Sequence, residues 1–153
     1  MIKFAKLKDK SAVNAIRKQV HALHAAARPD MFRQEFEPVA DRYDYYIKQY
    51  EYAVVVCVRD EKIVGFAVIK TENREETAFR VADKYLLVEE LGVDEACKRQ
   101  GVGTEIMNFV KQYAVKHDLS KIQLDYWAFN SSAAEFYRKA GFDVYRIYAE
   151  YHV

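Results

Sequence analysis

The sequence predicts a single α/β (α+β) domain over residues 1–153, with a mixed, twisted sheet of about six or seven strands flanked by about four helices. The length of 153 residues matches one ordinary domain, and 51% of the residues are hydrophobic, enough to bury a substantial core. A β-branched hairpin requires antiparallel pairing, whereas two later helices that connect strands indicate parallel pairing.

The first half of the chain alternates amphipathic stretches with β-branched runs. Apolar residues at spacings of three and four, from Val13 to Leu23, predict a helix. This helix should end before Pro29, because a proline pushes the preceding residue out of the helical region. The expected elements are a strand at 2–7, that helix, a helix at about 40–50, strands at 53–58 and 63–70 joined by a turn at 59–62, and a polar loop at 71–78.

The second half alternates longer strands and helices. An apolar stripe from Val102 to Tyr113 predicts a long helix. Gly141 suits the left-handed residue that ends a helix, here one over 131–139. The expected elements are a strand at 85–93, the long helix, a strand at 122–127, the helix at 131–139 and a final strand at 143–151.

Charge and cysteine usage exclude several classes of function. The net charge is +1 with both signs mixed along the chain, which argues against nucleic acid or an anionic membrane as a partner. No apolar stretch approaches the about 20 residues of a membrane span, and no signal-peptide core follows Met1, so we expect a cytoplasmic protein. Cys57 and Cys97 have no metal-ligand spacing, and no metal is expected.

The segment from Leu91 to Thr104 leaves a strand and enters a helix. Gly101 and Gly103 lack a Cβ, so a ligand can approach the backbone there. The first turn of a helix also offers unpaired N–H groups and a positive dipole end, which together suit a pyrophosphate. A P-loop would need a lysine after the last glycine, and a dinucleotide fingerprint would need a third glycine where Ile106 stands. A tight turn without any ligand is the structural alternative.

A second segment begins where a strand meets a helix. Asn130 stands at the junction, a position that favours an asparagine N-cap. Tyr137 follows seven residues later, nearly two turns on, so it shares a helix face with Asn130. Taken alone, this pattern indicates a cap and a core aromatic residue.

The two segments together resemble the GNAT superfamily of N-acetyltransferases. The run Lys98-Arg99-Gln100-Gly101-Val102-Gly103 resembles the acetyl-CoA signature Gln/Arg-x-x-Gly-x-Gly/Ala, with lysine in the first position. The pattern Asn130-x-x-Ala133-x-x-x-Tyr137-x-x-x-Gly141-Phe142 resembles the second motif of that family. Lys98 keeps the positive charge of an arginine at this position but lacks its planar guanidinium group, which can donate two parallel hydrogen bonds.

This resemblance implies an acetyl-CoA-dependent N-acetyltransferase that moves an acetyl group to a primary amine by direct attack in a ternary complex. The backbone of the strand end would pair with the pantetheine arm, the glycine loop would hold the pyrophosphate, and Tyr137 would protonate the leaving thiolate. The implied cofactor-binding residues are Leu91, Val93, Lys98, Arg99, Gln100, Gly101, Val102, Gly103, Thr104, Asn130 and Tyr137.

Three carboxylates are candidates for the base that deprotonates the amine: Glu89, Glu90 and Asp125. Glu89 and Glu90 are adjacent, so in a regular strand only one of them would face the cleft. A bulge is expected near Gly92, because strands must splay to admit the cofactor. Glu89 is favoured slightly, and a water relay without a dedicated base stays open.

The acetyl acceptor is left open among polyamines, aminoglycosides, amino acids and peptide N-termini. Twelve tyrosines favour an aromatic pocket or a homodimer face as much as a core. The alternative function is a non-catalytic acetyl-CoA sensor or interaction module. Residues expected near the acceptor are His21, His24, Arg28, Asp30 and Phe32, with tyrosine groups at 43–52 and 145–151.

Overall fold

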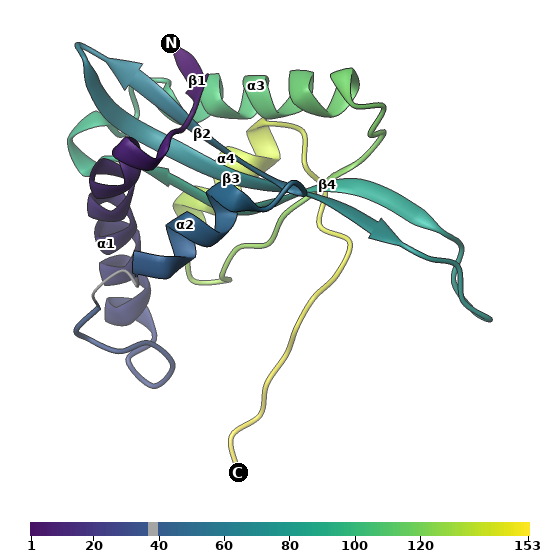
Figure 1. Cartoon of the computed structure of the whole chain (residues 1–153). Helices are drawn as coiled ribbons and strands as arrows, with labels where there is room; N and C mark the ends of the chain where they lie inside the picture. Colours follow the sequence, from purple (N-terminus) through teal and green to yellow (C-terminus); the bar gives the residue numbers. More distant parts are fainter. Residues whose placement is uncertain (37–39) are drawn as a thin grey trace.

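The computed structural model describes residues 1–36 and 40–153 and shows a central sheet between helices (Figure 1). The elements are β1 (Ile2–Phe4), a 3-10 turn η1 (Leu7–Asp9), α1 (Lys10–Ala27), α2 (Ala40–Lys48), β2 (Tyr52–Arg59), β3 (Lys62–Arg74), β4 (Asp83–Val93), a 3-10 turn η2 (Glu95–Cys97), α3 (Val102–Lys116), β5 (Ile122–Gln123) and α4 (Ser131–Lys139).

The sheet has the order β1-β2-β3-β4-β5, with antiparallel pairing up to β4 and parallel pairing between β4 and β5. The predicted mixed sheet is therefore confirmed, with five strands in the described part of the chain instead of six or seven. The expected strand at 122–127 ends after Gln123, and residues 143–151 are extended but belong to no strand. The expected loop at 71–78 was also wrong in part, because β3 continues through Arg74.

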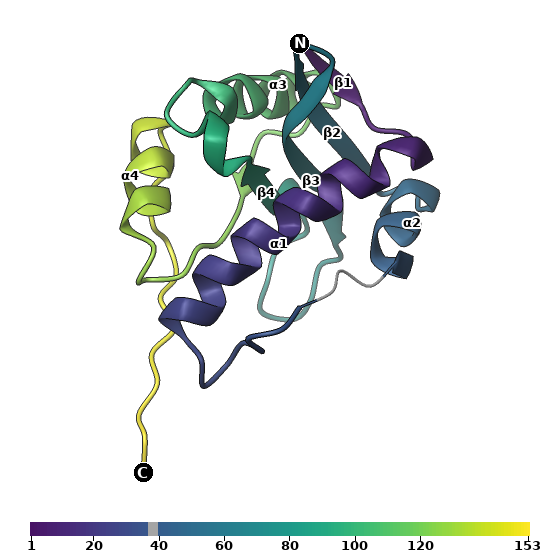
Figure 2. The same cartoon turned by 90° about the vertical axis from the view of Figure 1, so that its left-hand side faces the viewer.

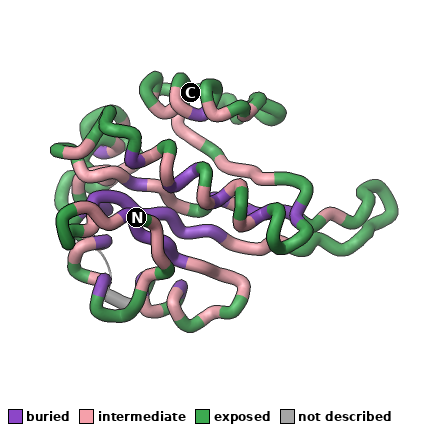
Figure 3. Tube along the Cα trace, turned by 90° about the horizontal axis from the view of Figure 1, so that it is seen from above, coloured by how far each residue is buried: buried purple, intermediate pink, exposed green. Residues whose placement is uncertain are grey.

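Helices cover both faces of the sheet (Figure 2). Alternate residues of β2 pack on opposite faces of the sheet, because successive side chains of a strand point to opposite faces. Val54 and Val56 pack in one cluster with α1 and α2, whereas Val55 and Cys57 pack in another with α3. Buried residues accordingly follow the central strands, while the C-terminal end is exposed (Figure 3). Among the described helices, none has the length and apolar character needed to span a membrane.

The turn between β2 and β3 offers a test of local backbone strain. Asp60 and Glu61 have φ values of 46° and 62°, a left-handed conformation that is unfavourable for residues with a Cβ. We expect Glu61→Gly to raise the free energy of unfolding by about 0.5–1 kcal/mol, because relief of this strain exceeds the entropy that glycine adds to the unfolded chain. Urea denaturation measures the change. Lys62→Gly, one residue later in β3, is the control and should destabilise the protein instead.

Candidate acetyl-CoA and catalytic site

The sheet opens between β4 and β5. The two strands pair only at Leu86 with Ile122 and at Leu87 with Gln123. β4 continues to Val93, and the chain after Gln123 leaves toward α4. In the part of the chain that the structure describes, no strand pairs with this edge of β4 beyond Leu87.

A bulge in β4 sets which backbone groups face this opening. Val68 pairs with Glu90 and Ile69 with Val88, so Glu89 is the extra residue. The bulge thus lies at Glu89, and its expected position near Gly92 was wrong. Asp94 N–H donates to the carbonyl of Val64 in β3, at 2.9 Å. Since backbone direction alternates along a strand, the N–H and C=O groups of Leu91 and Val93 point the other way, into the opening.

The glycine loop ends in a helix terminus with unpaired amides. The first helical hydrogen bond of α3 runs from Glu105 N–H to Gly101 O, at 2.9 Å. The amides of residues 102–104 precede this ladder and are available to an anion. Gly101 has a φ of 83°, which favours glycine. A Cβ on Gly103 would come within 3.3 Å of the Phe136 ring, so this glycine lets α3 pack closely against α4.

Side chains of the loop hold its shape. Asp94 accepts a hydrogen bond from Ala96 N–H at 2.9 Å. Lys98 pairs with Glu95 at 2.8 Å, and Gln100 donates to the carbonyl of Ala96 at 3.0 Å. The side chains at 98 and 100 therefore make contacts within the loop itself.

α4 carries Tyr137 into the core beside the opening. The predicted cap is confirmed, because Asn130 Oδ1 accepts from Ala133 N–H at 3.0 Å. Tyr137 is only 8% exposed and stacks on Tyr126 with ring centroids 5.5 Å apart. Burial, together with the nearby carboxylate of Asp125, raises the pKa of the Tyr137 phenol to about 12. The phenol is therefore protonated at neutral pH.

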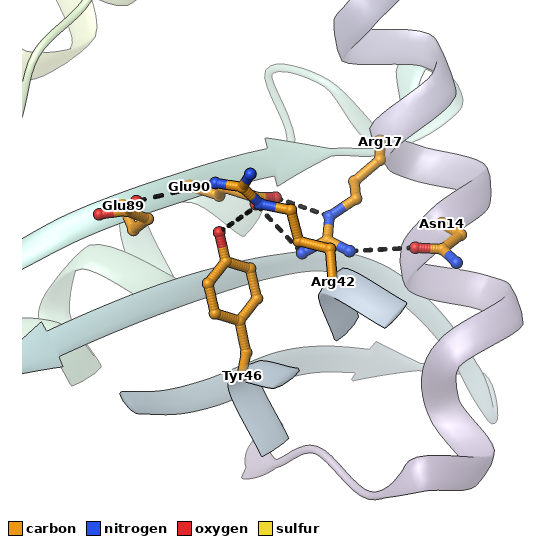
Figure 4. A network of polar contacts seen from close by, with 6 residues as sticks. All are labelled: Asn14, Arg17, Arg42, Tyr46, Glu89 and Glu90. Atoms are coloured by element: carbon orange, nitrogen blue, oxygen red, sulfur yellow. Dashed lines mark hydrogen bonds and ion pairs between the residues drawn. The ribbon is translucent and has the colours of Figure 1, made fainter. Parts of the chain in front are cut away.

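The bulge places Glu89 and Glu90 on the same side of the sheet, where both approach Arg42 (Figure 4). Arg17 is 8% exposed and binds Glu90 through two hydrogen bonds, of 2.6 and 3.1 Å. Asn14 accepts a further bond from Arg17 at 3.1 Å. Glu90 is thus held in a bidentate ion pair, whereas Glu89 makes a longer ion pair with Arg42, at 4.0 Å.

Removal of one partner of the Arg17–Glu90 pair should be costly. We expect Arg17→Met to lower the free energy of unfolding by about 3 kcal/mol, because it leaves the partly buried Glu90 carboxylate with Arg42, at 4.0 Å, in place of a bidentate partner. Glu90→Leu in the same chain should recover much of the loss. The exposed Lys139–Glu135 pair has the same 2.6 Å separation and serves as the control. Lys139→Met should change stability by less than about 0.5 kcal/mol in the same urea titration. Equal losses of unfolding free energy in Arg17→Met and Lys139→Met would contradict the view that burial makes loss of one partner of the Arg17–Glu90 pair costly.

An aromatic cluster joins the end of α1 to the segment before α4. His24 stacks on Phe32 with centroids 5.3 Å apart, and Phe32 meets Trp127 edge-on at 5.2 Å. Phe129 contacts both His24 and Trp127. The structure thus brings the predicted histidine region of α1 against the segment before Asn130. Sequence reasoning missed Trp127 and Phe129, although two aromatic residues directly before the cap were a usable signal. Burial and the neighbouring His21 lower the pKa of His24.

The tyrosine-rich segment of α2 has two roles. Tyr43 is fully buried and donates to the carbonyl of Lys6 at 2.6 Å, so it belongs to the core. A shallow cavity of about 370 Å³ lies over this helix. Arg42 lines the cavity and also lies 4.0 Å from the carboxylates of Glu89 and Glu90 at the bulge. The lining residues of the cavity are Arg42, Tyr45, Tyr46 and Tyr52.

The chain belongs to the acetyltransferase (GNAT) family, whose model matches residues 18–142. It is therefore a GNAT-fold acyltransferase. No curated protein sequence matches it. A crystallised tetramutant of the BH1408 protein from Bacillus halodurans shares 26% identity and superposes with a TM-score of 0.97, covering 100% of this chain and 99% of that one.

Two aminoglycoside 6'-N-acetyltransferases share the fold at 12% identity and a TM-score of 0.75. One is AAC(6')-IG from Acinetobacter haemolyticus without ligand, with 100% of this chain and 97% of that one covered. The other is AAC(6')-Iy in complex with CoA, with 100% and 98% covered.

Proposed function

We propose that the protein is an acetyl-CoA-dependent N-acetyltransferase that acetylates a primary amine by direct attack in a ternary complex. One observation carries the proposal. The first turn of α3 lies beside the end of β4 and beside α4, because a Cβ on Gly103 would come within 3.8 Å of Val93 and 3.3 Å of Phe136, the neighbour of Tyr137. Tyr137 itself packs in the same core cluster as Leu91 and Val93. A pyrophosphate, an extended amide-bearing arm and a thioester follow each other in acetyl-CoA in that order.

Backbone groups of the chain would hold most of acetyl-CoA in this proposal. The amides of residues 102–104 would bind the pyrophosphate, supported by the helix dipole and by Arg99. Leu91 and Val93 would pair with the pantetheine arm as an added strand. Acetyl-CoA supplies the activated acetyl group as a thioester. No metal is needed for this chemistry.

Tyr137 stabilises the leaving thiolate in this proposal. A thiol has an ordinary pKa of about 8.5, well below the value of about 12 for the Tyr137 phenol. Full proton transfer from the free phenol to the thiolate is therefore uphill. Tyr137 acts chiefly as a hydrogen-bond donor while negative charge develops on the sulfur. When its proton passes to the thiolate, a proton released by the attacking amine restores the phenol.

Glu89 is the proposed base, because Arg17 already occupies both oxygens of Glu90. We expect Glu89→Gln to lower kcat/KM for the amine by about 10²-fold. Steady-state kinetics with saturating acetyl-CoA measure the effect. Glu135→Gln, an exposed change on α4, is the control and should leave kcat/KM unaltered. A larger loss with Asp125→Asn than with Glu89→Gln would move the base to Asp125.

The acceptor is proposed to be a small molecule or peptide that presents a cationic amine. Tyrosine rings around the cavity over α2, together with the nearby carboxylate of Glu89, suit a positive charge, whereas Arg42 in the same lining opposes one. The aminoglycoside enzymes of the same fold support aminoglycosides as members of the test panel.

The proposal is tested by thiol release from acetyl-CoA with a panel of polyamines, aminoglycosides, amino acids and short peptides. Amine-dependent release supports the enzyme, and Tyr137→Phe supplies the control for background hydrolysis. Acetyl-CoA binding by calorimetry without turnover of any amine would instead favour a sensor. Absence of acetyl-CoA binding would overturn the proposal.

A further inference from the structure

We infer that the acetyl acceptor is a free α-amino acid, whose carboxylate binds Arg42 while its amine lies at Glu89. This inference deepens the proposed function and rests on it, because Glu89 is the base of that proposal.

Arg42 carries a positive charge on the wall of the cavity over α2. Its side chain is 63% exposed, and its ion pairs with Glu89 and Glu90 are both 4.0 Å long, which exceeds the length of a hydrogen bond. Glu90 instead receives two hydrogen bonds from Arg17, of 2.6 and 3.1 Å. A guanidinium has five N–H donors, so Arg42 keeps donors for an anion in the cavity.

Tyr46 holds the Arg42 guanidinium in place without neutralising it (Figure 4). Arg42 Nε donates to Tyr46 Oη at 2.8 Å, and the guanidinium lies 5.5 Å from the centre of the Tyr46 ring. Burial raises the pKa of Tyr46 to about 12, so its phenol is uncharged at neutral pH. With Nε bound in this way, the two terminal nitrogens of Arg42 suit a carboxylate that accepts two hydrogen bonds.

The short separation of Arg42 and Glu89 limits which amines can use both side chains. A ligand whose amine lies at Glu89 must place its anion close by, because only 4.0 Å separates the two side chains. A single carbon atom joins the amine and the carboxylate in a free α-amino acid. Polyamines and aminoglycosides carry no carboxylate, and the first carboxyl group of a peptide is an uncharged amide. The geometry therefore favours a free amino acid.

The charge of the surrounding network favours the same class of acceptor. Two arginines and two glutamates in contact balance one another: Arg17, Arg42, Glu89 and Glu90. A zwitterionic amino acid preserves this balance, whereas a polyamine or an aminoglycoside adds several positive charges beside Arg42. The rings of Tyr45 and Tyr52 in the cavity lining offer apolar surface to the side chain of the amino acid.

Calorimetry tests the inference, with CoA present so that no acetyl group is transferred. Each standard amino acid is compared with its α-carboxamide, which has the same side chain and amine but no negative charge. We expect at least one amino acid to bind about 30-fold or more tightly than its carboxamide. Arg42→Met should abolish most of this preference. Arg74→Met is the matched control and should leave the preference within about threefold, because Arg74 is also exposed and lies over a tyrosine ring, 5.3 Å from the centre of Tyr85.

Thiol release from acetyl-CoA separates this inference from the proposed function. Release with the preferred amino acid supports both. A preference that Arg42→Met removes, without thiol release, would support the carboxylate site and contradict the proposed acetyl transfer. Carboxamides or polyamines that bind and react as well as the amino acids would overturn the inference and leave the N-acetyltransferase in place. Binding of no amino acid, by protein whose near-ultraviolet circular dichroism shows it to be folded, would also overturn the inference.

Discussion

Tyr137→Phe should lower kcat by about 10²–10³-fold while the dissociation constant of acetyl-CoA stays within about twofold. The hydroxyl is lost, but the ring keeps its stacking on Tyr126 and its edge contact with Phe142, so the fold is preserved. Stopped-flow thiol release and calorimetry separate the two quantities. Tyr126→Phe removes the hydroxyl of the stacked neighbour and is the matched control. A fully active Tyr137→Phe enzyme would show that Tyr137 serves only in packing.

Gly103→Glu should weaken acetyl-CoA binding by at least about 100-fold. Its Cβ would meet the Phe136 ring at 3.3 Å, and its carboxylate would place a negative charge where the helix amides are proposed to receive a pyrophosphate. Gly103→Ala introduces the same Cβ without the charge, so the difference between the two variants isolates the electrostatic part. Calorimetry with acetyl-CoA gives both values. Unchanged affinity in Gly103→Glu would mean that the loop binds no phosphate.

Local chemistry made the ends of the helices predictable. Asn130 caps α4 and Gly141 ends it because capping depends on one residue and its immediate neighbours. Gly101 was singled out as a residue without a Cβ just before a helix, and the structure gives it a positive φ. The loop that leads into α3 could therefore be located from sequence before any tertiary contact was known, while its role in binding acetyl-CoA stays a prediction.

Contacts between residues far apart in the chain could not be predicted from the local sequence pattern. Arg17 and Glu90 are 73 residues apart, and no local rule indicates that their side chains form a bidentate pair. The bulge at Glu89 depends on the register between β3 and β4, which two adjacent glutamates do not reveal. The predicted final strand at 143–151 was wrong, because a strand forms only where a sheet edge pairs with it, and a local sequence pattern does not show whether such an edge is available.

The connection between Tyr137 and residues 143–153 ties the end of the chain to the helix that carries the phenol. Phe142 N–H donates to the carbonyl of Tyr137 at 3.0 Å, and the extended C-terminal residues begin at the next position. A change that displaces Phe142 therefore acts directly on the last turn of α4 and on the orientation of the Tyr137 ring.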